Sequence, residues 1–62
     1  MEKHIIVDTT QTVGKPYIDI NGENTDLIEN ADVFESKLEA ESYINYYSWN
    51  NWAIVEPLSK YK

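Results

Sequence analysis

The stretch "SKLEAESYINYYSWNNWAIVEP", residues 36–57, decides the fold of this 62-residue chain, because it contains a marked helix start and a strand. Ser36 is a favourable N-cap residue, and Glu39 follows three residues later. Each of the two side chains can bind a backbone N–H that the first helical turn leaves free. We therefore predict a helix that begins at Ser36.

Apolar residues after this start recur at helical spacing. Ala40, Tyr43, Ile44 and Tyr47 fall at i, i+3, i+4 and i+7, which makes one continuous stripe for packing on a sheet. Tyr46 lies at the edge of that stripe, about 100° around the helix axis from Tyr47. The stripe therefore predicts core positions, with Tyr46 flanking the core.

The segment "WAIVEP", residues 52–57, follows the polar exit "SWNN" and is typical of a closing strand that stops at a proline. Alternation places Trp52 and Ile54 on one face and Ala53 and Val55 on the other, so both faces are apolar. Because one helix covers one face of a sheet, the second face needs polar residues or a partner.

The first half of the chain predicts short strands. Residues 4–10, "HIIVDTT", are rich in β-branched side chains, and residues 17–20 alternate before Asn21-Gly22, a dipeptide suited to a hairpin turn. Residues 27–28 then indicate a returning strand or a turn, and residues 33–34 a further short strand.

These elements predict one α+β domain over residues 1–62, with short flexible termini. One helix packs on a small, three- to four-stranded, mainly antiparallel sheet in the order β-β-(β)-α-β. A chain this short buries only about 60% of its unfolded surface, so the core is thin and a homodimer is a plausible supplement.

The composition limits the possible functions. Eleven acids against five lysines, with no arginine, give a net charge of −6, which disfavours direct binding of nucleic acid and favours a basic partner. There is no cysteine, and the apolar run near the N-terminus is too short for a signal peptide or a membrane span. We expect a cytoplasmic protein without a membrane partner.

The usual catalytic and metal-binding sets are nearly empty. His4 is the one histidine, and we favour a structural or solvent-exposed role for it. The segment "DINGENTD", residues 19–26, fails the spacing of a calcium loop, and Gly14-Lys15 is followed by Pro16 instead of a residue that opens a helix after a phosphate loop. We expect no enzymatic activity, no cofactor and no metal.

An acid ladder is the most unusual feature of the charge pattern. Five acids recur at every third residue between positions 23 and 35. They are Glu23, Asp26, Glu29, Asp32 and Glu35. The ladder either provides a solvated, soluble surface or forms a negative stripe that imitates a nucleic-acid backbone and docks on a basic patch.

Two aromatic residues are left over once the core stripe is assigned. Trp49 sits in the polar exit "SWNN", and Tyr46 lies at the edge of the stripe. Tryptophan and tyrosine are enriched at the centres of interfaces. Each of the two therefore either caps the end of the core or contacts a partner.

Residues 31–57, "ADVFESKLEAESYINYYSWNNWAIVEP", resemble small phage- and prophage-encoded α+β accessory or inhibitor proteins in their order of strand, capped helix and closing strand. The resemblance implies a non-enzymatic, phage-type inhibitor in the host cytoplasm. Such a protein would occlude a basic nucleic-acid-binding surface of a host nucleic-acid-processing enzyme or defence complex. DNA mimicry is one way in which it would do so. The partner would meet the acid ladder together with Tyr46 and Trp49.

The alternative is a structural or assembly module. In that case the chain would self-associate through an open sheet face or an edge strand.

Overall fold

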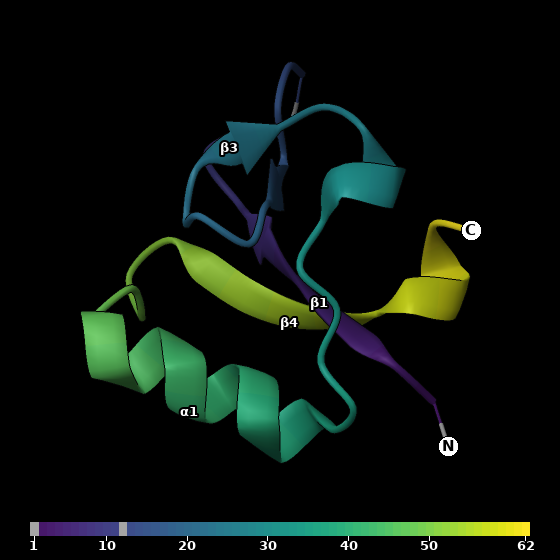
Figure 1. Ribbon diagram of the computed structural model, residues 1–62. Helices are drawn as coiled ribbons and strands as arrows, with labels where there is room; N and C mark the ends of the chain where they lie inside the picture. Colours follow the sequence, from purple (N-terminus) through teal and green to yellow (C-terminus); the bar gives the residue numbers. More distant parts are fainter. Residues whose placement is uncertain (1, 12) are drawn as a thin grey trace.

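The computed structural model describes residues 2–11 and 13–62; Met1 and Thr12 lie outside the described residues. A four-stranded antiparallel sheet in the order β3-β2-β1-β4 is packed against one helix, α1 (Figure 1). The predicted α+β class and its order of elements are confirmed. The elements are β1 His4–Asp8, β2 Tyr17–Ile18, β3 Asn24–Thr25, the 3-10 helix η1 Ile28–Asn30, α1 Lys37–Tyr47, β4 Ala53–Pro57 and the 3-10 helix η2 Leu58–Lys60.

Strand β1 lies at the centre of the sheet. It pairs with β4 along its whole length, from His4 opposite Pro57 to Asp8 opposite Ala53, and with β2 on its other side. Its residues 5–7 are all buried, because both faces of the sheet are covered at this strand. The β-branched run of the sequence therefore matches a strand that needs apolar residues on both sides.

The turn between β2 and β3 is one residue longer than the tightest hairpin. The Asp19 N–H donates to the Glu23 carbonyl at 2.8 Å, and the Gly22 N–H donates to the Asp19 carbonyl at 3.0 Å. Gly22 has a φ of 80°, which closes a three-residue loop, whereas Asn21 does not have a positive φ. The returning strand therefore comes earlier than expected, at residues 24–25.

The segment before α1 contains two isolated bridges in place of the short strand predicted at residues 33–34. Phe34 exchanges two main-chain hydrogen bonds with His4, and Ala31 pairs with Asp19. Of the two alternatives predicted at residues 27–28, the strand is wrong and the turn is correct, because Leu27 precedes the 3-10 helix η1 and Ile28 begins it. The chain thus pairs with β1 and with the residue that follows β2 only at single residues.

The predicted helix start is confirmed. The Ser36 hydroxyl accepts the Glu39 N–H at 3.1 Å, and Oε1 of Glu39 accepts the Glu35 N–H at 3.1 Å. In the usual capping box, the glutamate side chain accepts the N–H of the N-cap residue itself. Here it accepts the N–H of Glu35, the residue before the N-cap. Ala40 and Ile44 are the buried residues of α1, in agreement with the predicted stripe.

Helix α1 ends at Ser48, which has a φ of 60° and a ψ of 40°. The Ser48 N–H donates to the Asn45 carbonyl, and the Trp49 N–H donates to the Ile44 carbonyl. This pair of bonds defines a Schellman ending, which usually has glycine at the left-handed position. A serine there carries a steric cost, because its Cβ approaches the following carbonyl oxygen.

The Ser48→Gly variant is expected to be more stable than the wild type by about 0.5–1 kcal/mol, since glycine removes this steric cost and Ser48 is exposed. Urea unfolding monitored by tryptophan fluorescence measures the change. The matched control is Ser42→Gly, an exposed serine within α1, which should destabilise by about 0.5–1 kcal/mol. A loss of stability in both variants would contradict the steric argument.

The sheet has an apolar core on each face. The first core lies under α1, and its buried residues are Ile6, Ile18, Phe34, Ala40, Ile44 and Ala53. The second core lies on the opposite face and contains Ile5, Val7 and Ala31, packed against Tyr17, Ile28, Leu58 and Tyr61. The expectation of an uncovered second face is therefore wrong, because η1 and η2 supply its cover.

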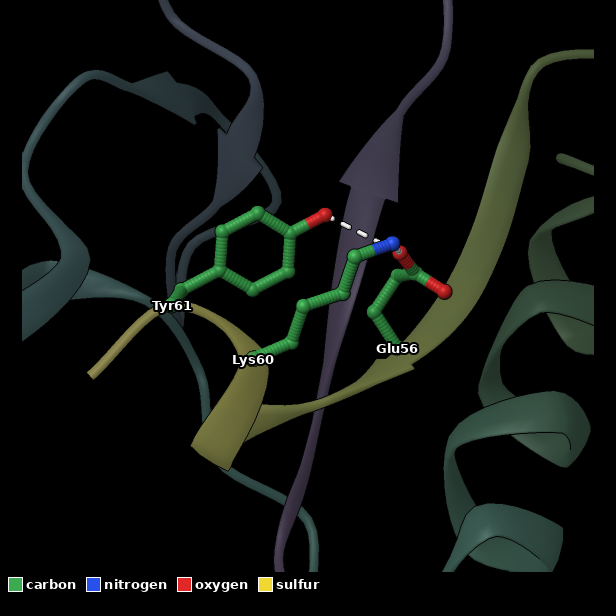
Figure 2. A network of polar contacts seen from close by, with 3 residues as sticks. All are labelled: Glu56, Lys60 and Tyr61. Carbon is green, nitrogen blue, oxygen red and sulfur yellow. Dashed lines mark hydrogen bonds and ion pairs between the residues drawn. The ribbon is translucent and has the colours of Figure 1, made fainter.

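The C-terminal segment is held against this second face through Glu56. The Tyr61 hydroxyl donates to Oε1 of Glu56 at 3.0 Å, and Nζ of Lys60 binds the same oxygen, as Figure 2 shows. The Tyr61 ring also meets Tyr17 edge-on, with 5.5 Å between centroids. The hydrogen bond from Lys60, followed by that from Tyr61, outweighs burial and lowers the pKa of Glu56. The C-terminal segment thus completes the second core through Leu58 and Tyr61.

Candidate protein-binding surface

Six aromatic rings form a continuous chain along one side of α1 and its exit. Each ring lies within 5.7 Å, centroid to centroid, of the next, and the contacts are edge-on or tilted except for one stacked pair. The six residues are Phe34, Tyr43, Tyr46, Tyr47, Trp49 and Trp52. We call them the aromatic chain. Edge-on and stacked pairs of this kind each add about 0.5–1.5 kcal/mol beyond the area they bury.

The aromatic chain runs from the core to the solvent. Phe34 is buried, Tyr43 is half-buried, Tyr47 is 48% exposed and Tyr46 is 81% exposed. The prediction that Tyr47 is a core residue is therefore only partly correct, because about half of Tyr47 stays exposed. Its ring lies on the last turn of α1, where Trp49 folds back and stacks on it at 5.0 Å and 22°. The outer rings are therefore held in place by packing while they remain accessible.

Trp49 caps the end of the first core. It is half-buried and packs against that core, and it contacts the Tyr43 ring at 5.7 Å. A Cβ placed on Gly22 would lie 3.5 Å from the Trp49 ring, so the β2–β3 turn closes over this indole. The Schellman ending explains the position, because the second residue past such a helix end commonly packs back on its last turns.

Three carboxylates lie near the inner part of the aromatic chain, around Tyr43. Asp32 and Asp19 come from adjacent segments, since the Asp32 N–H donates to the Ile18 carbonyl at 2.9 Å. Glu39 lies one turn before Tyr43 on the same side of α1. We call Asp19, Asp32 and Glu39 the acidic rim.

The charges of the acidic rim act on one another and on the rings. Burial, and then the neighbouring charges of Glu39 and Asp19, raise the pKa of Asp32. Burial also raises the pKa of Tyr43, followed by the effects of Tyr47, Asp32 and Asp19. The rim therefore places negative potential near the half-buried Tyr43 ring, which contacts the more exposed Tyr47.

The acid ladder is divided by the fold. Residues 23–35 run from the β2–β3 turn through β3 and η1 to the start of α1, so the ladder extends across the molecule (Figure 1). Glu23, Asp26 and Glu29 are exposed, while Asp32 joins the acidic rim. Glu35 is paired with Lys3 at 3.4 Å. Of the seven predicted site residues, Tyr46 and Trp49 both contact the Tyr47 ring, and Asp32 lies close enough to Tyr43 to raise its pKa.

Few cations oppose these acids. Among residues 2–11 and 13–62, the ion pairs are Lys3 with Glu35 and Lys60 with Glu56, and neither includes a member of the acidic rim. Glu23, Asp26 and Glu29 have no ion pair within the same residues. The negative charge near the aromatic chain is thus uncompensated within the described part of the protein.

Other groups offer little chemistry. Within the described residues, no cluster of three or more His, Asp or Glu side chains is placed to hold a metal ion. Nδ1 of His4 is buried without a hydrogen-bond partner, and its main chain is bonded to Phe34. The one histidine therefore lies within the packing of β1, away from any second catalytic group in the described structure.

A shallow groove of about 460 Å³ lies between α1 and the outer edge of β4. Its lining mixes polar residues of α1 with the apolar start of β4. The lining residues are Lys37, Glu41, Ile44, Asn45, Asn50, Ala53, Ile54 and Val55. The groove lies on the side of α1 away from the aromatic chain.

Comparisons with protein-family models, curated proteins and solved structures find no match to this chain. No helix in residues 2–11 and 13–62 combines the length and the apolar character needed to cross a membrane.

Proposed function

We propose that this chain is a non-enzymatic, acidic protein-binding module that occludes a basic nucleic-acid-binding surface of a host enzyme or defence complex, in the manner of phage-type inhibitors. The observation that carries the proposal is the uncompensated acidic rim beside the half-exposed rings of the aromatic chain. Charge gives such a surface long-range attraction, and aromatic side chains give it short-range affinity.

The exposed ladder residues fit the attraction step. Glu23, Asp26 and Glu29 are solvent-exposed, so their charges act mainly on the rate of encounter and weaken as salt rises. A basic groove that normally binds the negative phosphates of a nucleic acid would meet negative charge on this chain as well. The ladder and the acidic rim together would therefore compete with DNA or RNA for the partner.

The test begins with capture of partners from a host lysate at low salt, followed by a DNA-competition assay on each basic enzyme recovered. The wild type is expected to displace labelled DNA in an anisotropy titration. The variant with Glu23→Gln, Asp26→Asn and Glu29→Gln should bind the enzyme about tenfold more weakly, since each exposed charge contributes a fraction of a kcal/mol.

The matched control is Glu41→Gln, which removes one exposed acid on the opposite side of α1. It should change affinity by less than about twofold. Simultaneous binding of DNA and this chain to the enzyme would contradict occlusion, as would an affinity unchanged in the triple variant.

The second candidate is a self-associating module, and one observation favours it. The Thr9 N–H donates to the Trp52 carbonyl, and the Leu58 N–H donates to the Lys3 carbonyl. Alternation along β4 then directs the N–H and C=O of Val55 to the outer edge of the sheet. Pro57 has no N–H to extend this edge. Light scattering over a concentration series tests the candidate, and a strict monomer would exclude it.

A further inference from the structure

The aromatic chain has free ring surface that the protein itself does not use for a cation. Among the described residues, Nζ of Lys60 lies 5.7 Å from the centroid of the Tyr61 ring. This cation–ring contact is on the face of the sheet opposite α1. The chain has no arginine of its own. The outer rings, Tyr46 and Tyr47, are therefore available to a cation from elsewhere.

The positions of these rings are fixed more firmly than those of ordinary surface residues. Tyr46 meets Tyr47 edge-on at 4.9 Å, and Tyr47 stacks on Trp49, which is closed over by the β2–β3 turn. A ring that is already held loses less freedom when a partner binds it. Tyr46 and Tyr47 thus have the character of an interface anchor.

The acidic rim lies near Tyr43, the ring that connects the outer rings to the core. Glu39 and Tyr43 are one turn apart on α1, Tyr43 contacts Tyr47 at 5.0 Å, and Asp32 is two residues before Phe34, which also contacts Tyr43. The negative charge of the rim, which no ion pair within the described residues offsets, would therefore attract a planar cation toward the outer rings. Arginine fits this arrangement better than lysine, because its guanidinium is weakly hydrated, stacks on rings and donates several hydrogen bonds in a fixed plane.

We propose that Tyr46 and Tyr47, with the acidic rim, bind an arginine side chain from a basic segment of the partner protein. This inference rests on the proposed function and specifies what the surface recognises. Lysine-rich segments would be attracted by the same charges, but they would not gain the stacking contribution.

The experiment compares two unstructured peptides of equal length and charge, one with four arginines and one with four lysines at the same positions. Binding to the full chain is followed at low salt by anisotropy of the labelled peptide and by the tryptophan fluorescence of the protein, to which Trp49 and Trp52 both contribute. The arginine peptide is expected to bind about three- to tenfold more tightly than the lysine peptide and to change the tryptophan emission more strongly.

Tyr46→Ala is the first test variant, because a side chain that is 81% exposed can be removed without loss of the fold. The double variant Tyr46→Ala/Tyr47→Ala is the second. Both should lose the preference for arginine while keeping the affinity for the lysine peptide within about twofold. The control is Leu38→Ala, an exposed apolar residue of the same helix, which should keep the preference.

The outcomes separate the two proposals. Equal affinities of the wild type for both peptides would overturn the arginine site and leave an acidic binding module. An arginine preference that persists in both tyrosine variants would also overturn it. If neither peptide binds at low salt, the proposed function fails together with the arginine site.

Discussion

Replacing Ile5 with alanine is expected to destabilise the protein about as much as replacing Ile6 with alanine, although the two side chains lie on opposite faces of β1. Both are almost fully buried, Ile6 under α1 and Ile5 under the cover provided by η1 and η2. Truncation of a buried isoleucine to alanine costs about 2–5 kcal/mol. A 62-residue domain has a total stability of roughly 3–9 kcal/mol, so either variant would lose a large share of it.

Urea unfolding followed by far-UV circular dichroism measures both variants, at reduced temperature if the folded baseline is lost. The control is Val13→Ala, an aliphatic residue that is 91% exposed, which should change stability by less than about 0.5 kcal/mol. A cost for Ile5→Ala of less than about half the cost for Ile6→Ala would show that the second core contributes little. The fold would then depend on the contact between α1 and the sheet.

The features of the fold that local chemistry controls could be predicted from the sequence. The helix start at Ser36 depends on residues three apart, and the stripe of Ala40 and Ile44 depends on helical period, and both are confirmed. The second core could not be predicted in this way. It forms because Ile28 meets Leu58 and Tyr61, which come from the other end of the chain, on one face, and no periodic pattern connects the two segments.

The same distinction applies to the candidate surface. Tyr46 and Trp49 stood out because each breaks a local pattern, and the structure places both in the aromatic chain. Asp19 was missed because its place beside Asp32 depends on pairing between segments on either side of β3. Glu39 carried a detectable signal, since it precedes Tyr43 by four residues, but its role as a capping residue was the more obvious one.

Asp8 is expected to be the polar side chain whose loss destabilises the fold most. It is 7% exposed, and its carboxylate accepts the Thr10 hydroxyl at 2.6 Å, the Thr10 N–H at 2.9 Å and the Asn24 side-chain amide at 3.0 Å. These bonds connect the end of β1 to β3. Hydrogen bonds to a charged group contribute about 1.5–3 kcal/mol, so Asp8→Ala should lower the free energy of unfolding by about that amount at neutral pH. Asp26→Asn, at an exposed aspartate, is the control and should have little effect.

The contribution of Asp8 should also depend on pH with a defined sign. Burial alone would raise the pKa of Asp8, but the hydrogen bonds from Thr10 and Asn24 outweigh burial and hold the pKa below its ordinary value of 3.8. Folding therefore favours the ionised form, and the stabilisation is present above that value and lost as the pH falls through the lower pKa of the folded state. Asp8→Asn places a second amide opposite Asn24 and cannot ionise, so its deficit relative to wild type should shrink as the pH falls below 3.8. A deficit that stays constant from neutral to acidic pH would show that Asp8 acts through its shape and not through its charge.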